Sequence, residues 1–137
     1  MLGRAGRPFY DSNVLLYGFR GDVGRIRTVR ELLSLRGTVS VQVLNEMTNV
    51  CRRKLAMSLE EIEFVLQPLR TLVNIVPVTL AAHDRAFDLL RRYNLSVYDA
   101  VLIAAALEAG CVTFYSEDMQ DGLVVDGRLT IVNPFAT

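Results

Sequence analysis

The sequence predicts a single α/β domain over residues 1–137, with a mostly parallel sheet covered by helices on both faces. Short β-branched or apolar runs alternate with longer segments whose apolar residues recur at helical spacing, the pattern of βαβ units. The sequence contains no internal repeat and no low-complexity tract. A chain of 137 residues matches one domain and buries roughly two-thirds of its unfolded surface without needing disulfides or zinc.

Five short segments have the composition of strands. Thr38–Val41 is β-branched, and Val112–Tyr115 is apolar and aromatic. The dipeptide Asp126-Gly127 lies between two apolar runs and predicts a hairpin over residues 123–132. The predicted strands cover residues 7–10, 38–41, 74–78, 112–115 and 129–132.

Capping residues mark the ends of the predicted helices. Asp22 precedes a helical pattern that stops at Gly37, and Ser58 with Glu61 has the spacing of a capping box. Residues 97–109 are apolar nearly all round, which predicts a helix buried in the middle of the domain. The predicted helices cover residues 13–19, 22–36, 43–55, 58–72, 79–93 and 97–109.

The charges balance overall but not locally. Fifteen basic and fifteen acidic residues give a net charge of zero, which argues against a protein that holds nucleic acid by net charge alone. Residues 1–58 carry ten basic and four acidic side chains, whereas residues 59–137 carry five basic and eleven acidic ones. Nearly all basic residues are Arg, which fits either genomic base composition or bidentate phosphate recognition.

Cysteine usage and hydropathy predict a cytoplasmic protein. Cys51 and Cys111 are too few and too far apart for a zinc site or a disulfide scaffold, so we expect both to be reduced and buried. Residues 1–7 have charge but no apolar segment behind them, unlike a signal peptide. The longest apolar stretch, residues 100–107, is far shorter than the roughly 20 residues that a membrane helix needs.

Four acids interrupt apolar segments of the sequence: Asp11, Glu46, Asp99 and Asp118. An isolated carboxylate in apolar surroundings costs several kcal/mol unless it caps a helix, pairs with Arg or binds a cation. Asp11 and Asp118 follow predicted strands, whereas Glu46 and Asp99 lie in the first turns of predicted helices. Because the carboxyl ends of parallel strands line one edge of a sheet, we expect the four acids to converge there.

A cluster of carboxylates favours metal chemistry. Carboxylates held together repel one another, which raises their pKa values or recruits a cation. Oxygen ligands without His or Cys select Mg²⁺ or Mn²⁺ over zinc. Such a site suits the metal-assisted hydrolysis of a phosphodiester.

Each acid also has a purely structural interpretation. Asp11 can be a helix N-cap, Glu46 a solvated flank residue, and Asp99 a partner of the helix dipole. Asp118 and Asp121 can be turn residues. The convergence of four acids, rather than any one of them, favours the metal site.

Other motifs support fewer functions. His83, the only histidine, lies among polar helix residues and is expected at the surface, which leaves His-based triads without support. Neither GxGxxG nor GxxxxGK[ST] occurs, which removes nucleotide-cofactor and P-loop interpretations. The basic groups at 52–54 and 91–92 fit solvated helix ends better than an RNA-binding surface.

The segments around the four acids resemble, in order and spacing, the four motifs of PIN-domain ribonucleases. These segments are residues 9–17, 40–47, 95–106 and 115–122. The resemblance covers essentially the whole chain. It implies a three-layer α/β/α sandwich with a mostly parallel sheet of about five strands.

The resemblance also implies a Mg²⁺- or Mn²⁺-dependent endoribonuclease. Asp11 and Asp99 would be direct metal ligands, and Asp118 would complete the site. Glu46 would bind the metal directly or through water. The implied supporting residues are Asn13, Ser116 and Asp121, the last at a position that varies in the family.

Small single-domain proteins of this kind resemble the VapC toxins of toxin–antitoxin pairs. This resemblance implies a cognate antitoxin whose tail blocks the acidic groove, and a homodimer. Residues 1–7 are an unusual start for this family, and we expect the true start nearer Pro8.

Two other function classes remain open from the residues alone. A phosphatase or phosphotransfer enzyme on a similar sheet would be expected to have Asp-x-Asp after the first strand, or paired acids near the first strand with a lysine on a late strand. The chain instead has Asp11-Ser12-Asn13, and Lys54 is its only lysine. A non-catalytic binding module, in which the acids merely cap helices, is the other alternative.

Overall fold

The computed structural model describes residues 6–136, so the predicted absence of a signal peptide concerns residues that lie largely outside it. Six strands form one sheet in the order β3-β2-β1-β4-β6-β5. All neighbouring pairs are parallel except β5 and β6, which form an antiparallel hairpin at one edge. The mostly parallel sheet is as predicted, with one strand more than the expected five. The strands are β1 (Phe9–Tyr10), β2 (Thr38–Ser40), β3 (Asn74–Val76), β4 (Thr113–Tyr115), β5 (Val124–Val125) and β6 (Leu129–Val132).

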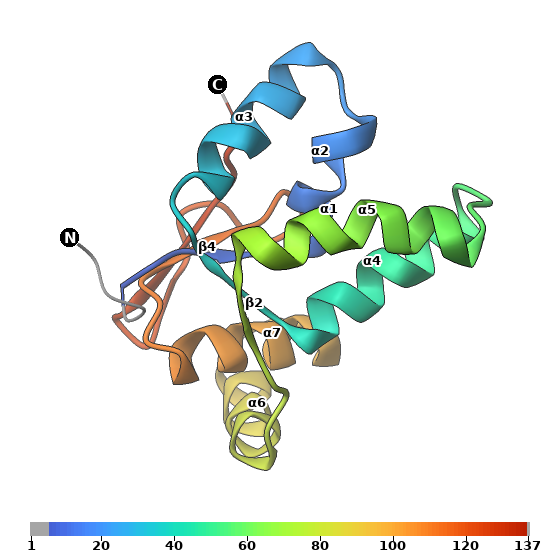
Figure 1. The fold of residues 1–137 in the computed structure, drawn as a ribbon. Coiled ribbons are helices and arrows are strands. Elements are labelled where there is room, and N and C mark those ends of the chain that lie inside the picture. Colours follow the sequence, from blue (N-terminus) through green and yellow to red (C-terminus); the bar gives the residue numbers. More distant parts are fainter. Residues whose placement is uncertain (1–5, 137) are drawn as a thin grey trace.

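Helices cover both faces of this sheet, as the prediction of a three-layer α/β/α sandwich requires. Figure 1 shows α6 and α7 below the strands, and α1, α2, α3 and α5 above them. Helices α6 and α7 pack against each other, and α7 and α4 both contact β2. The helices are α1 (Ser12–Leu15), α2 (Tyr17–Arg20), α3 (Val23–Leu33), α4 (Val41–Arg53), α5 (Leu59–Leu72), α6 (Leu80–Arg92) and α7 (Val97–Glu108).

The core forms where the sheet meets these layers. The rings of Phe9 in β1 and Phe114 in β4 are fully buried and stack with centroids 5.1 Å apart. Helix α7 buries nearly every residue from Ala100 to Leu107, which confirms the expected central helix. Cys51 and Cys111 are both buried and free, also as expected. Within the part of the chain that the structure describes, no helix is long and apolar enough to cross a membrane.

The predicted capping signals hold, with one difference after α3. Ser58 and Glu61 form the reciprocal capping box of α5. Helix α3 ends at Leu33 rather than at Arg36, and Arg36 itself takes the left-handed conformation, with φ of 53°. Gly37 is needed for another reason: a Cβ atom there would lie 2.5 Å from the Pro8 carbonyl oxygen and 2.6 Å from the Tyr10 ring.

The segment after β1 also differs from its prediction. The expected turn over residues 13–19 is two short helices, α1 and α2, joined at Leu16. Asp11 begins α1 directly after β1, so a single residue separates the central strand from the first helical turn. This arrangement places the Asp11 side chain at the carboxyl end of the sheet.

Candidate active site

The four predicted acids reach one cavity from four separate segments. Asp11 is the N-cap of α1, Glu46 lies in α4, Asp99 lies in the first turn of α7, and Asp118 lies in the loop after β4. All four line the same open cavity of about 430 Å³. The four acids therefore border one cavity, as far as the expected convergence goes.

Asp11 is the most tightly held of the four carboxylates. Its side chain is buried, with 5% exposed. Oδ1 accepts a hydrogen bond of 2.7 Å from the Ser12 N–H, as an N-cap does, and Oδ2 accepts one of 2.9 Å from the fully buried Ser116 hydroxyl. A longer contact of 3.4 Å joins Asn13 Nδ2 to Oδ2. The structural interpretation of Asp11 as a cap and its place in the cavity are thus both realised.

Glu46 and Asp99 come from two further helices, α4 and α7. Glu46 is half-buried, and its Oε1 accepts a hydrogen bond of 3.2 Å from the Ser12 hydroxyl. Asp99 is also half-buried, and its backbone N–H donates to Ser96 Oγ, the cap of α7. Asp118 is exposed at the mouth of the cavity.

Burial and mutual repulsion raise the pKa values of three of these acids. Burial raises the pKa of Asp11 to about 6 against the opposing hydrogen bond from Ser116, and repulsion by Asp99 and Asp118 adds to the rise. Burial and then repulsion by Asp11 raise the pKa of Glu46. Burial, followed by repulsion from Asp118, raises the pKa of Asp99 despite its Ser96 hydrogen bond. The cavity thus holds negative charge at a cost that a cation would reduce.

The chemistry of the cavity walls fits a hard divalent cation. Among residues 6–136, the lining side chains offer carboxylate, amide and hydroxyl oxygens and include no His or Cys. Across the same residues, no three Asp, Glu, His or Cys side chains are grouped closely enough to form a ready-made metal site. The acids therefore share a cavity without meeting at one point.

A family model described as the PIN domain matches residues 9–120 of the sequence, which include all four acids. The chain belongs to the PIN-domain family.

Solved structures with the same fold include several toxin–antitoxin proteins. A chain of a toxin–antitoxin complex from Klebsiella pneumoniae matches this PIN domain with a TM-score of 0.72 at 18% identity, over 95% of this chain and 99% of that one. FitAcB from Neisseria gonorrhoeae matches with a TM-score of 0.69 at 14% identity, over 95% and 99% of the two chains.

Another such structure is Mycobacterium tuberculosis VapC20, described as a sarcin–ricin loop cleaving toxin. It matches with a TM-score of 0.62 at 23% identity, over 78% of this chain and 86% of that one. The family match and these neighbours confirm the predicted resemblance to VapC-type PIN-domain proteins. A comparison with curated protein sequences gives no match.

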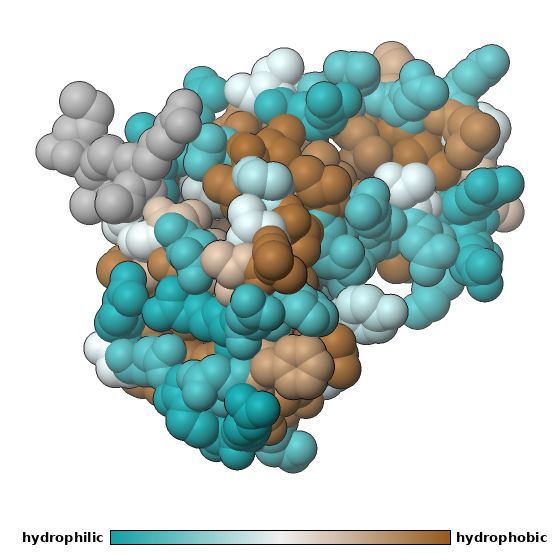
Figure 2. Space-filling model, turned by 90° about the horizontal axis from the view of Figure 1, so that it is seen from below, coloured by the Kyte–Doolittle hydropathy of each residue, from teal (hydrophilic) through white to brown (hydrophobic). Residues whose placement is uncertain are grey.

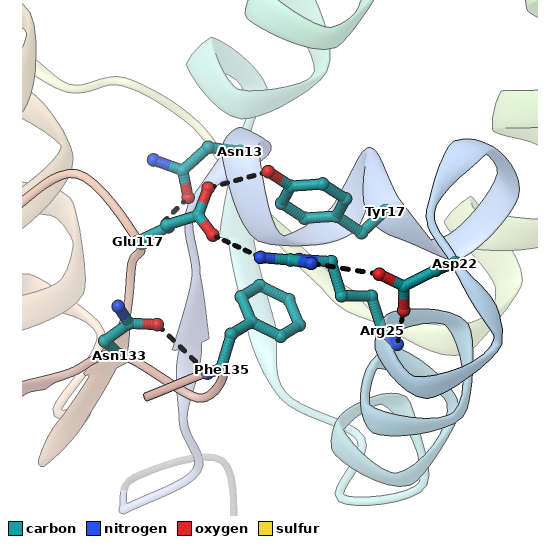
Figure 3. Close-up of polar contacts among 7 residues, drawn as sticks. All are labelled: Asn13, Tyr17, Asp22, Arg25, Glu117, Asn133 and Phe135. Carbon is teal, nitrogen blue, oxygen red and sulfur yellow. Dashed lines mark hydrogen bonds and ion pairs between the residues drawn. The ribbon is translucent and has the colours of Figure 1, made fainter. Parts of the chain in front are cut away.

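A polar network beside the acids was missed by sequence reasoning. The Tyr17 hydroxyl donates a hydrogen bond of 2.8 Å to Glu117 Oε1, and Arg25 lies 3.7 Å from Glu117 Oε2 and 4.9 Å over the Tyr17 ring. The Glu117 N–H donates to Asn13 Oδ1, and the Phe135 ring packs edge-on against Tyr17. Figure 3 shows how these side chains join α1, α2 and α3 to the loop after β4 and to the C-terminal segment. These contacts fix the loop that carries Asp118.

Asp121 lies apart from the other predicted site residues. It is exposed, and among residues 6–136 it is not part of the cavity lining. Its Oδ1 accepts a hydrogen bond of 2.8 Å from the Asn133 N–H. In this PIN domain, the observed contact of Asp121 is with the C-terminal segment, whereas the predicted supporting residues Asn13 and Ser116 both contact Asp11.

Two cations also line the cavity, and sequence reasoning did not single them out as part of the site. Arg20 ends α2, and Lys54 is the C-cap of α4. Residues 52–54 look alike in sequence, but Glu46, Val50 and Lys54 recur every four residues and lie on one face of α4. This spacing is the signal that distinguishes Lys54 from its two neighbours.

Proposed function

We propose that this PIN domain is a Mg²⁺- or Mn²⁺-dependent endoribonuclease and the toxin of a toxin–antitoxin pair. The observation that carries the proposal is the convergence of Asp11, Glu46, Asp99 and Asp118 on one cavity. The family match supports it, as do neighbours that are toxin–antitoxin proteins, one of them a toxin that cleaves the sarcin–ricin loop.

In this proposal the carboxylates hold the metal. Asp11 and Asp99 would bind it directly, Asp118 would complete the site, and Glu46 would bind it directly or through water. The bound cation would lower the pKa of a water molecule and stabilise the charge that develops on the phosphate. Among the described residues the acids are not gathered at one point, so the exposed Asp118 and the half-buried Glu46 and Asp99 would have to move closer to Asp11 to hold a cation with it.

The remaining polar residues position these acids. Ser116 and the Ser12 N–H donate hydrogen bonds to the two oxygens of Asp11, which fixes the orientation of that carboxylate. The Ser12 hydroxyl orients Glu46, and the Glu117–Asn13 contact fixes the loop next to Asp118. These groups act through the acids and not on the substrate.

A cleavage assay tests the proposed function. The purified protein is incubated with single-stranded RNA in Mg²⁺, Mn²⁺ or EDTA, and the Asp11→Asn and Asp99→Asn variants are compared with Asp84→Asn. Asp84 is an exposed acid of α6 outside the cavity, so its substitution makes the same charge change away from the proposed site. We expect EDTA and both site substitutions to reduce cleavage by about a hundredfold or more, and Asp84→Asn to leave it unchanged.

The same proteins separate this proposal from its alternatives. Millimolar Mn²⁺ should raise the melting temperature of the parent and not of Asp99→Asn, because binding to the folded state stabilises it. Turnover of a small phosphomonoester without RNA cleavage would favour a phosphatase. No thermal shift and no cleavage would favour a non-catalytic binding module.

Partners follow from the same neighbours. Several of them are toxin–antitoxin assemblies, so we expect a cognate antitoxin that covers the acidic cavity, and a homodimer. Figure 2 shows brown patches on the face that carries α6 and α7, and Val97 and Tyr98 at the start of α7 are 56% and 65% exposed. Light scattering on the purified protein tests the dimer, and a monomeric mass would contradict it. The two cysteines are buried and free, which suits the reducing cytoplasm, and we expect the toxin and its antitoxin to act there.

A further inference from the structure

The cavity that holds the four acids has a second, basic end. Two helical paths leave the carboxyl edge of the sheet, and each begins with an acid and ends with a cation. One path runs from Asp11 through α1 and α2 to Arg20, and the other runs along α4 from Glu46 to Lys54. Helices α1 and α4 pack against each other, and residues of both paths line the same groove, which is the cavity described above. The groove is therefore acidic where the strands end and basic where the helices end.

The two ends are separated by more than one phosphodiester group. Along α4, the eight-residue step from Glu46 to Lys54 corresponds to about 12 Å of helix axis. Val50 lies between them on the same face of α4, and Leu16, at the junction of α1 and α2, also lines the cavity. A phosphate held by the acidic end through a metal therefore leaves the basic end available for another group of the same strand.

The two cations have no acidic partner of their own. Arg25, Arg85 and Arg92 form ion pairs, whereas no carboxylate of residues 6–136 lies within salt-bridge distance of Arg20 or Lys54. Both are exposed and both line the cavity.

The dipole of α4 does not by itself account for Lys54. A cation at the C-terminal end of a helix stabilises it, but Arg52 and Arg53 already stand in the last turn of α4. Arg52 and Arg53 are exposed, and neither is among the described residues that line the cavity. Lys54 is the member of this basic group that faces the groove.

We propose that Arg20 and Lys54 bind a backbone phosphate of single-stranded RNA next to the scissile one. The proposal rests on the proposed ribonuclease function and adds the direction in which the strand lies: from the acidic edge of the sheet along α2 and α4. Arg20 offers a planar fork for two phosphate oxygens, and Lys54 offers a mobile ammonium. Leu16 and Val50 provide an apolar surface for the nucleoside between the two phosphates.

A binding experiment tests this subsite without relying on cleavage. Fluorescence anisotropy measures the binding of a short labelled single-stranded RNA of mixed sequence to Asp99→Asn protein, at several salt concentrations. Arg20→Gln and Lys54→Gln are added singly to this background, with Arg27→Gln and Arg53→Gln as matched controls. The controls remove the same charge from exposed positions of α3 and α4 that do not line the cavity.

The expected result is specific to the two cavity cations. Each of Arg20→Gln and Lys54→Gln should weaken binding about three- to tenfold and lower the slope of log affinity against log salt by about 0.7 for each lost contact. Arg27→Gln and Arg53→Gln should change neither quantity, and Lys54→Arg should restore binding. Equal effects at all four positions would overturn the subsite, because they would show only net charge.

A kinetic experiment separates this inference from the ribonuclease proposal. With the native Asp99 restored, Arg20→Gln and Lys54→Gln should raise KM for RNA with little change in kcat, and should not affect cleavage of a dinucleotide that lacks the neighbouring phosphate. Cleavage by the parent with KM unchanged in both variants would overturn the subsite alone. A parent that cleaves no RNA in Mg²⁺ or Mn²⁺ would overturn the ribonuclease proposal, and the subsite with it.

Discussion

The Tyr17 hydroxyl donates a hydrogen bond of 2.8 Å to Glu117 Oε1, and this bond connects α2 to the loop that carries Asp118. The two residues are 100 positions apart in the sequence. Arg25 packs over the same tyrosine ring and contacts the other carboxylate oxygen of Glu117. The loop after β4 is thus held by the segments that follow β1, on the side of the cavity where Asp118 is exposed.

Removing this hydrogen bond should loosen the loop. We expect Tyr17→Phe to lower the free energy of unfolding by about 0.5–1.5 kcal/mol, because the phenyl ring keeps its packing while Glu117 loses a donor. Urea denaturation measures the change. Tyr98→Phe, at an exposed tyrosine of α7, is the matched control and should be neutral. Equal losses in the two variants would show that the bond to Glu117 contributes nothing of its own.

The raised pKa of Asp11 predicts that stability falls as the pH rises. Below its ordinary pKa of 3.8, the carboxyl is neutral in both folded and unfolded chains and costs nothing. Above the folded pKa of about 6, the folded state bears the full cost of the buried charge. We therefore expect Asp11→Asn to stabilise the metal-free protein by about 1–3 kcal/mol at pH 7.

The pH dependence distinguishes this effect from a general one. The advantage of Asp11→Asn should shrink between about pH 6 and pH 4 and vanish below. Urea denaturation in EDTA across this range is the measurement. A variant that is less stable than the parent at pH 7 would mean that the cap to the Ser12 N–H needs a charged acceptor.

Ser116 and Ser40 are both fully buried, but we expect their substitution by alanine to change the stability in opposite directions. Ser116→Ala removes the 2.9 Å donor to Asp11 and should destabilise the protein at pH 7 by about 1–3 kcal/mol while raising the pKa of Asp11 further. Among the described residues, the Ser40 hydroxyl has no hydrogen-bond partner, so Ser40→Ala should be neutral or stabilising. Denaturation and an NMR titration of the Asp11 carboxyl carbon check both expectations. An unchanged Asp11 pKa in Ser116→Ala would contradict the first expectation, and a loss of stability in Ser40→Ala would contradict the second.

Adding a single methyl group at Gly37 should greatly lower the free energy of unfolding. Gly37→Ala places a Cβ against the Pro8 carbonyl and the buried Tyr10 ring, whose hydroxyl also accepts a hydrogen bond from the Gly37 N–H. We expect a loss of about 2–3 kcal/mol from overpacking, read from urea denaturation.

Gly24→Ala is the control for this substitution. Gly24 lies inside α3, where an added Cβ meets only Asp22 Oδ1 at 3.4 Å. Alanine there should stabilise the helix by about 0.5–1 kcal/mol. If Gly37→Ala is tolerated equally well, the close approach of Tyr10 is not a constraint on the fold.

The alternation of strands and helices, the helix caps and the hairpin could be predicted because each depends on neighbouring residues. Ser58 with Glu61 and Asp126 with Gly127 are such local signals, and both are realised. The start of α4 was placed at residue 43 instead of 41, since the β-branched Val41 extends the strand pattern that ends at Ser40. The end of α3 was misplaced because tertiary packing against Tyr10, and not a helix stop, requires Gly37.

The acids of the site were predictable because a carboxylate in an apolar segment stands out in a sequence. Their meeting in one cavity follows from parallel strands and needed no further information. The Tyr17–Glu117 contact and the basic end of the cavity were not predictable in the same way, since the contact joins residues 100 positions apart and arginines occur at many exposed positions. Only the structure distinguishes Arg20 from Arg27, whereas the four-residue spacing from Glu46 through Val50 to Lys54 separates Lys54 from Arg53.

The position of β1 at the centre of the sheet has a consequence for synthesis on the ribosome. Among the described elements, β1 is the first strand to be made and pairs with both β2 and β4, and β4 and Asp118 come after all seven helices. A nascent or prematurely terminated polypeptide therefore lacks one neighbour of its central strand together with one of its four acids. The four acids can share the cavity only after residue 118 has been made, so a chain that stops earlier has an incomplete site.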